Sequence, residues 1–65
     1  MKKFHVYAKR AKYRAMTTNV EIAKKIGKSP VQIGIWMRAD DVKVSVAMKI
    51  ADACGMTLCD FFVDE

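Results

Sequence analysis

Apolar residues recur along this chain in short groups that have the spacing of amphipathic helices. The first group, Phe4, Tyr7, Ala8 and Ala11, falls at i, i+3, i+4 and i+7, as on one face of a helix over about residues 2–15. Three later groups have similar spacing: Ile22, Ala23 and Ile26; Ile33, Trp36 and Met37; Ala47, Ile50, Ala51 and Cys54. The pattern predicts an all-α chain of short helices that each bury one face.

A capping box marks the start of the second helix. Glu21 follows Thr18 by three positions, the arrangement in which the threonine hydroxyl accepts a bond from the glutamate N–H and the glutamate side chain bonds back to the cap. Gly27 follows the last apolar residue of this group, and glycine readily adopts the left-handed conformation that ends helices. We therefore expect a helix over about residues 18–26.

The same signal recurs directly after this glycine. Ser29 and Gln32 form a second box, and Pro30 occupies the first helical position, where a missing N–H costs no hydrogen bond. These residues predict a third helix over about residues 30–38. Because the turn between the two helices has only three residues, the helices should cross at a steep angle.

Two further helices are predicted in the second half of the chain. Residues 39–43 have the composition of a loop whose aspartates bond to nearby backbone, and Ser45 is the expected N-cap of a helix that Gly55 ends. A last short helix begins near Thr57. Its aromatic end, residues 61–63, fits two roles, completion of the core or contact in a homodimer, and the sequence leaves both open.

The length and the cysteines limit the class of protein. Sixty-five residues suffice for a single domain, residues 1–65, with a small core. No apolar run reaches the about 18 residues of a membrane span, and four basic residues between positions 9 and 14 interrupt any signal-peptide core. We expect a cytoplasmic protein that has no membrane partner.

Cys54 and Cys59 should be buried free thiols, the alternatives being a disulfide or a metal site.

No group of residues in the sequence indicates catalysis or metal binding. His5 is the only histidine, and no serine, cysteine or carboxylate constellation lies beside it. Together with Cys54 and Cys59 it falls short of the four ligands of a structural zinc site. We therefore expect no enzyme activity, no cofactor and no small-molecule substrate.

Charge is distributed unevenly along the chain. Residues 1–28 carry nine Lys and Arg against one acidic residue, net +8, whereas residues 29–65 carry three against six, net −3. A strongly basic half attracts polyanions, chiefly nucleic acid or an acidic membrane surface, through a salt-sensitive interaction that does not depend on sequence. The alternative is a basic surface that is merely solvated.

The spacing of Ala23, Gly27 and Ile33 matches the centre of a known motif, with a small residue between two helices, a glycine in the turn and an anchor on the second helix. With residues 18–29, Trp36 and residues 50–56, this makes residues 16–62 resemble the Cro/CI (XRE) helix-turn-helix family. The resemblance implies a compact, five-helix, lambda-repressor-like domain with a helix-turn-helix at about residues 18–38.

The resemblance also implies a function. Such proteins bind double-stranded DNA with sequence preference as transcriptional regulators of phages, prophages and other mobile elements, and dimers suit palindromic half-sites. The helix over residues 18–26 would lie across the DNA backbone and the helix over residues 30–38 would enter the major groove. The residues expected at the DNA are Asn19, Lys28, Ser29, Pro30, Val31, Gln32, Ile35, Arg38 and Lys43. Of these, Gln32 would carry most of the specificity, while Lys24 and Lys25 would flank the phosphate contacts.

The outer face of the predicted third helix departs from the family pattern. Base edges are usually read by hydrogen-bonding side chains, and here only Ser29, Gln32 and Arg38 offer them. Val31 and Ile35 suit thymine methyl groups, but they also suit an apolar surface that binds another protein. The second interpretation is a protein-interaction module on a helix-turn-helix scaffold, such as an anti-repressor or an antitoxin-like partner.

Overall fold

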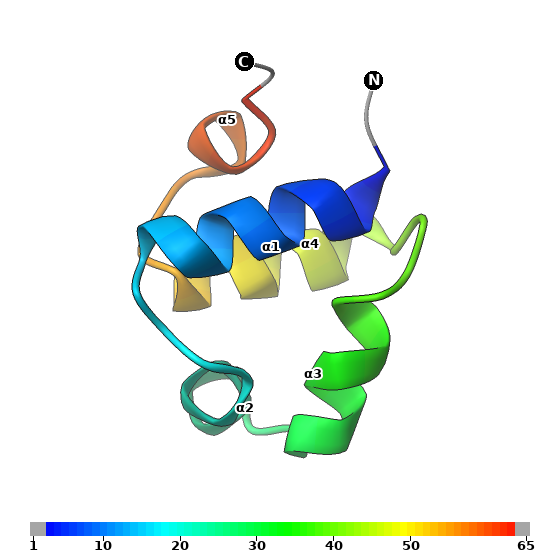
Figure 1. Cartoon of the computed structure of the whole chain (residues 1–65), viewed down its shortest axis with the longest axis vertical. Helices are drawn as coiled ribbons and strands as arrows, with labels where there is room; N and C mark the ends of the chain where they lie inside the picture. The colour runs from blue at the N-terminus through cyan, green and yellow to red at the C-terminus, as the bar shows by residue number, and fades with distance from the viewer. Residues whose placement is uncertain (1–2, 64–65) are drawn as a thin grey trace.

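Five α-helices and no strand make up residues 3–63, the part of the chain that the computed structural model describes (Figure 1). The helices are α1 (Phe4–Arg14), α2 (Asn19–Ile26), α3 (Pro30–Trp36), α4 (Val44–Ala53) and α5 (Leu58–Phe61). This confirms the predicted all-α fold and its five helices. The first helix was expected from residue 2, which lies outside the described residues, and Lys3 is its N-cap.

The helices form a small cluster around α1 and α4. In Figure 1, α1 crosses the middle of the molecule in front of α4, with α5 above them and α2 and α3 below. α2 packs against α3 and α4, and α5 packs against α1 and α4. Within residues 3–63, no helix has the length and apolar character needed to cross a membrane.

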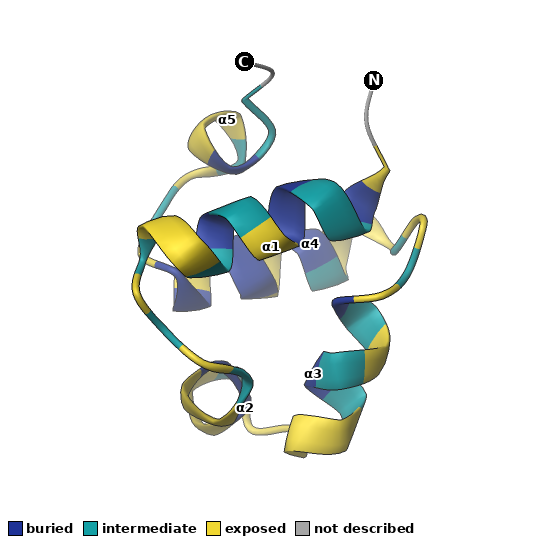
Figure 2. Cartoon of the chain, viewed as in Figure 1, coloured by how far each residue is buried: buried dark blue, intermediate teal, exposed yellow. Residues whose placement is uncertain are grey.

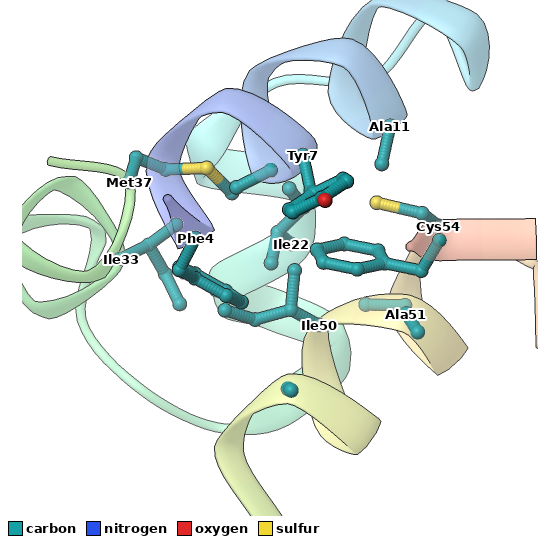
Figure 3. Packing of buried hydrophobic residues seen from close by; sticks show 14 residues of the cluster. Phe4, Tyr7, Ala11, Ile22, Ile33, Met37, Ile50, Ala51 and Cys54 are labelled. Atoms are coloured by element: carbon teal, nitrogen blue, oxygen red, sulfur yellow. The ribbon is translucent and has the colours of Figure 1, made fainter. Parts of the chain in front are cut away.

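The apolar stripes predicted from the sequence converge in one core. Figure 2 shows buried positions on every helix, and all four members of the first stripe are buried. Phe4 of α1, Ile22 of α2, Ile33 of α3 and Ile50 of α4 meet there, as Figure 3 shows. Burial of apolar surface is the main contribution to stability in so small a domain, so this convergence holds the helices together.

The aromatic end of the chain completes this core. Phe61 is buried and stacks on Phe4 with ring centroids 5.6 Å apart. Phe62 is half-buried, and its ring is T-shaped to that of Tyr7, with ring centroids 5.1 Å apart. Of the two roles that the sequence left open for residues 61–63, completion of the core is therefore present, and contact in a homodimer stays a prediction.

Two predicted helix starts carry the expected side-chain caps, and the start of α5 has one as well. Thr18 Oγ1 accepts a hydrogen bond from the Glu21 N–H (3.3 Å), Ser29 Oγ accepts one from the Gln32 N–H (3.2 Å), and Thr57 caps α5 in the same way. Among the described residues no return bond runs from the Glu21 or Gln32 side chain to its cap. Each box therefore contributes one bond rather than two.

The predicted N-cap of α4 is wrong. Lys43, not Ser45, is the N-cap; its side chain makes no cap bond, and its carbonyl accepts from the N–H groups of Val46 and Ala47, both at 3.0 Å. The preceding loop is bonded to α1, whose Phe4 and His5 N–H groups donate to the carbonyls of residues 40 and 39. A side-chain cap contributes only about 1 kcal/mol, so these tertiary bonds decide where the helix begins.

The loop aspartates behave differently from each other. Asp41 accepts a local bond from the Val42 N–H at 2.9 Å, as predicted. Asp40 instead contacts the start of α1, with its carboxylate 3.1 Å from Lys3 Nζ and 3.7 Å from His5 Nε2. The loop is thus held to α1 by side chains as well as by backbone.

The two cysteines are free, but only one of them is buried. Burial raises the pKa of the Cys54 thiol, while the nearby charge of Lys25 acts in the opposite direction. Cys59 is exposed, so the prediction of two buried thiols is wrong for this residue. The reason is that α5 has four residues and turns Phe61 to the core, which leaves Cys59 on its outer side.

Candidate nucleic-acid interface

α2 and α3 are joined by residues 27–29, the short turn at which the sequence predicts a helix-turn-helix. Gly27 has φ of 83°, and the N–H groups of Gly27 and Lys28 both donate to the Ala23 carbonyl, at 2.8 and 3.0 Å. No atom approaches within 4 Å of a Cβ placed on Gly27, so the backbone conformation alone favours glycine here. In Figure 1, α2 is seen nearly end-on while α3 runs roughly vertically in the plane of the view, so the two helices are far from parallel.

Buried anchors hold this pair of helices in place. Ile22 and Ala23 of α2 and Ile33 of α3 are all buried in the common core. Because close-packed side chains cannot shift without opening a void, the positions of the outer residues on α3 are set by these anchors.

The first turns of α3 expose most of the residues that were predicted to read bases. Ser29, Pro30 and Val31 are exposed and Gln32 is half-buried. Val31 has an exposed fraction of 73%, and Ile35, one turn later, has 49%. The structure therefore brings these five residues to the beginning and outer side of one helix, with Ser29 and Gln32 as the hydrogen-bonding side chains among apolar neighbours.

Arg38 and Lys43 lie beyond this helix. α3 ends at Trp36, two residues short of the predicted limit, so Arg38 follows the C-cap. Its guanidinium nevertheless lies beside α3. Nη1 of Arg38 is 4.0 Å from the position that a Cβ atom on Gly34 would occupy. Lys43 is exposed at the start of α4, and within residues 3–63 no hydrogen bond or ion pair connects it to α3.

The start of α2 contains a contact that the sequence did not reveal. Asn19, the first residue of α2, accepts a hydrogen bond through Oδ1 from Lys12 Nζ at 3.2 Å. The Asn19 amide can still donate through its N–H groups, and the lysine ammonium keeps further N–H donors as well. Lys12 lies in α1, and the turn over residues 15–18 brings the end of this helix close to the start of α2.

Several basic residues of this region have no carboxylate partner. Lys25 Nζ donates to the Ala53 carbonyl at 3.1 Å, and Lys12 bonds to the Asn19 amide. Lys24 and Lys28 are exposed, and for residues 3–63 no ion pair involves either of them. Uncompensated positive charge of this kind attracts a polyanion.

No group of three or more His, Cys, Asp or Glu residues in the described part of the chain could hold a metal ion.

Comparison with protein-family models, with curated proteins and with solved structures finds no match to this chain.

Proposed function

We propose that this protein is a sequence-preferring, double-stranded DNA-binding transcriptional regulator with a lambda-repressor-like domain of the Cro/CI kind. The observation that carries the proposal is a short-turn helix pair, anchored by buried residues, whose second helix exposes its first turns to solvent. The proposal includes a cytoplasmic location, no enzyme activity, and a phage, prophage or mobile-element setting.

In the proposed complex, α3 enters the major groove and α2 lies over the backbone. The Gln32 amide reads adenine through paired hydrogen bonds, and Val31 and Ile35 contact thymine methyl groups. Asn19 and Lys28 bind phosphates, because both present N–H groups near the start of α2 or the turn. Specificity therefore comes from α3 and much of the affinity from the basic half of the chain.

Selection from a random duplex DNA pool tests the proposal. An enriched site should bind at least about a thousandfold more tightly than scrambled DNA at near-physiological salt. Gln32→Ala should lower this preference by roughly 5- to 150-fold while scrambled DNA binds as before, because a paired base contact contributes about 1–3 kcal/mol of discrimination. Asn19→Ala, the matched phosphate-side variant, should weaken binding to both DNAs equally. An unchanged preference in Gln32→Ala would remove this residue from base reading.

Homodimer formation belongs to the same proposal, and an apolar groove supports it. A hollow of about 620 Å³ lies between the start of α1, the start of α4 and α5, lined in part by Val42, Val44, Leu58 and Phe62. Val44 is largely exposed beside it. An enriched DNA site with two-fold symmetry, bound by two chains in sedimentation, would support the dimer, and a non-palindromic site bound by one chain would contradict it.

A second candidate function is a protein-interaction module that uses the same face of α3. The exposed apolar side chains of Val31 and Ile35 favour it, because apolar groups grouped on one surface often mark interfaces. The variant Val31→Ser with Ile35→Ser separates the two functions. Loss of selected-site preference supports DNA reading, whereas unchanged DNA binding together with loss of a protein complex supports the interaction module.

A further inference from the structure

The outer face of α1 presents a surface that the helix-turn-helix does not use. Tyr13 and Met16 have exposed fractions of 85% and 91%, the two highest among the exposed large apolar side chains of residues 3–63. Basic residues surround them. We call this group the α1 surface: Lys9, Arg10, Lys12, Tyr13, Arg14 and Met16.

Two open hollows flank Tyr13 on this surface. One has a volume of about 650 Å³ and is lined by Lys9, Lys12, Tyr13, Met16 and Thr17. The other, of about 330 Å³, is lined by basic residues on both sides of the same ring. Hollows beside an exposed aromatic ring can receive apolar side chains of a partner, and such side chains gain affinity there by leaving water.

The charge of the α1 surface is of one sign. α1 contains four Lys and Arg residues and no acidic residue. Lys9 makes no ion pair within the described residues, Lys12 bonds to an amide oxygen, and Arg14 Nη1 donates to the Asp60 carbonyl at 3.1 Å. Since no carboxylate of residues 3–63 neutralises these three side chains, the complementary partner is acidic.

The composition of the α1 surface favours protein over lipid or nucleic acid. The other apolar residues of α1, including Phe4 and Tyr7, are buried in the core and cannot enter a bilayer. Phosphates are bound by N–H donors and gain nothing from a fully exposed methionine. Tyrosine, methionine and arginine, in contrast, are enriched at protein interfaces, and methionine adapts its shape to a partner.

We propose that the α1 surface docks an acidic segment of another protein. Carboxylates of the segment pair with Lys9, Lys12 and Arg14, and one or two of its apolar side chains pack against Tyr13 and Met16 in the flanking hollows. In the view of Figure 1, α1 ends on the left and α3 lies on the right, so the end of α1 is separate from the helix proposed to enter the DNA groove. The inference does not depend on what α3 binds.

Peptide selection tests this docking surface directly. A library of random twelve-residue peptides is selected against the full chain, and the enriched peptides are measured by fluorescence anisotropy. We expect sequences in which Asp and Glu bracket an aromatic residue or a leucine. Tyr13→Ser and Met16→Ser should each weaken binding at least about tenfold, because truncation of a central apolar anchor has effects of this size. Val44→Ser and Met48→Ser, which alter exposed apolar residues of α4, should leave binding unchanged.

Two charge-reversal variants and two ligands that are not proteins complete the test. Lys9→Glu should abolish binding, while Lys49→Glu on α4 should leave it within about twofold. The proposal is overturned if no acidic peptide is enriched, or if the Val44 and Met48 variants weaken binding as much as the Tyr13 and Met16 variants. It is equally overturned if oligothymidine or phosphatidylserine vesicles, and not acidic peptides, perturb the amide NMR signals of α1.

Discussion

Met16 takes the left-handed conformation at the end of α1, with φ of 53°. Its N–H donates to the Tyr13 carbonyl (3.1 Å) and the Thr17 N–H donates to the Lys12 carbonyl (3.2 Å), the paired bonds of a Schellman motif. Gly55 takes this conformation after α4 with φ of 73°. Sequence patterns recognise such a helix end by its glycine, so the one at Met16 was not visible in advance.

Met16→Gly should raise the free energy of unfolding by about 0.5–1 kcal/mol. A side chain in the left-handed region costs about 1–2 kcal/mol, part of which is offset by the greater freedom of glycine in the unfolded chain, and the exposed methionine buries little. Urea denaturation measures the difference. The control Lys9→Gly, at an exposed site inside α1, should lower stability by about 1 kcal/mol. A loss of stability in Met16→Gly would show that the turn stores no strain.

The buried Cys54 thiol should make the stability of the protein depend on pH in the alkaline range. Burial raises the pKa of Cys54, so above about pH 8.5 the unfolded thiol ionises before the folded one. The stability that the protonated thiol contributes is full below that pH and is lost as the pH rises through the folded pKa. Unfolding free energies at pH 7.5 and 9.5 should therefore differ less in Cys54→Ala than in the wild type. Equal pH dependence in the two proteins would contradict this account.

At the scale of the element, the helices follow their local signals except at α4. Thr18, Ser29 and Thr57 cap the helices that the sequence assigned to them, because each cap acts within three residues. α4 begins two residues before the position that Ser45 predicted, since the loop in front of it is bonded to α1. Local signals are therefore reliable where no tertiary bond competes with them.

Lys43→Ser should stabilise the protein by about 0.5–1 kcal/mol. Lys43 is the N-cap of α4 without a side-chain cap bond, and a serine hydroxyl there can accept from an N–H in the first turn. Thermal denaturation followed by circular dichroism measures the gain. Ser45→Ala is the matched control and should change stability by less than about 0.5 kcal/mol, because an exposed serine inside the helix caps nothing. A larger loss in Ser45→Ala would reinstate it as the cap.

At the scale of the whole molecule, the uneven charge of the sequence places most basic and most acidic side chains on different helices. The basic half, residues 1–28, contains α1 and α2. The acidic half, residues 29–65, contains α3, the loop of residues 39–43, α4 and α5. The affinity for a polyanion should therefore depend on salt through the lysines near the proposed helix-turn-helix, and not through Lys49 of α4.

Lys28→Ala should reduce the slope of log affinity against log salt by about one for scrambled duplex DNA, because each phosphate contact releases about one counterion. Anisotropy titrations over a salt series measure the slope. Lys49→Ala removes the same charge from α4, in the acidic half, and should leave the slope unchanged. Equal effects of the two substitutions would mean that net charge, rather than the proposed interface, governs binding.

The sequence by itself determined the all-α class, the five helices and the anchors Ile22, Ala23 and Ile33, because helical periodicity and capping act over three or four residues. It also indicated the residues at the start of α3 that the structure exposes. Only the tertiary structure decided the start of α4, the exposure of Cys59, the Lys12 contact with Asn19 and the open hollows beside Tyr13. The start of α4 depends on bonds between residues 4–5 and 39–40, which are far apart in the chain. The Lys12 contact and the hollows depend on the turn at the end of α1, which no glycine marks in the sequence.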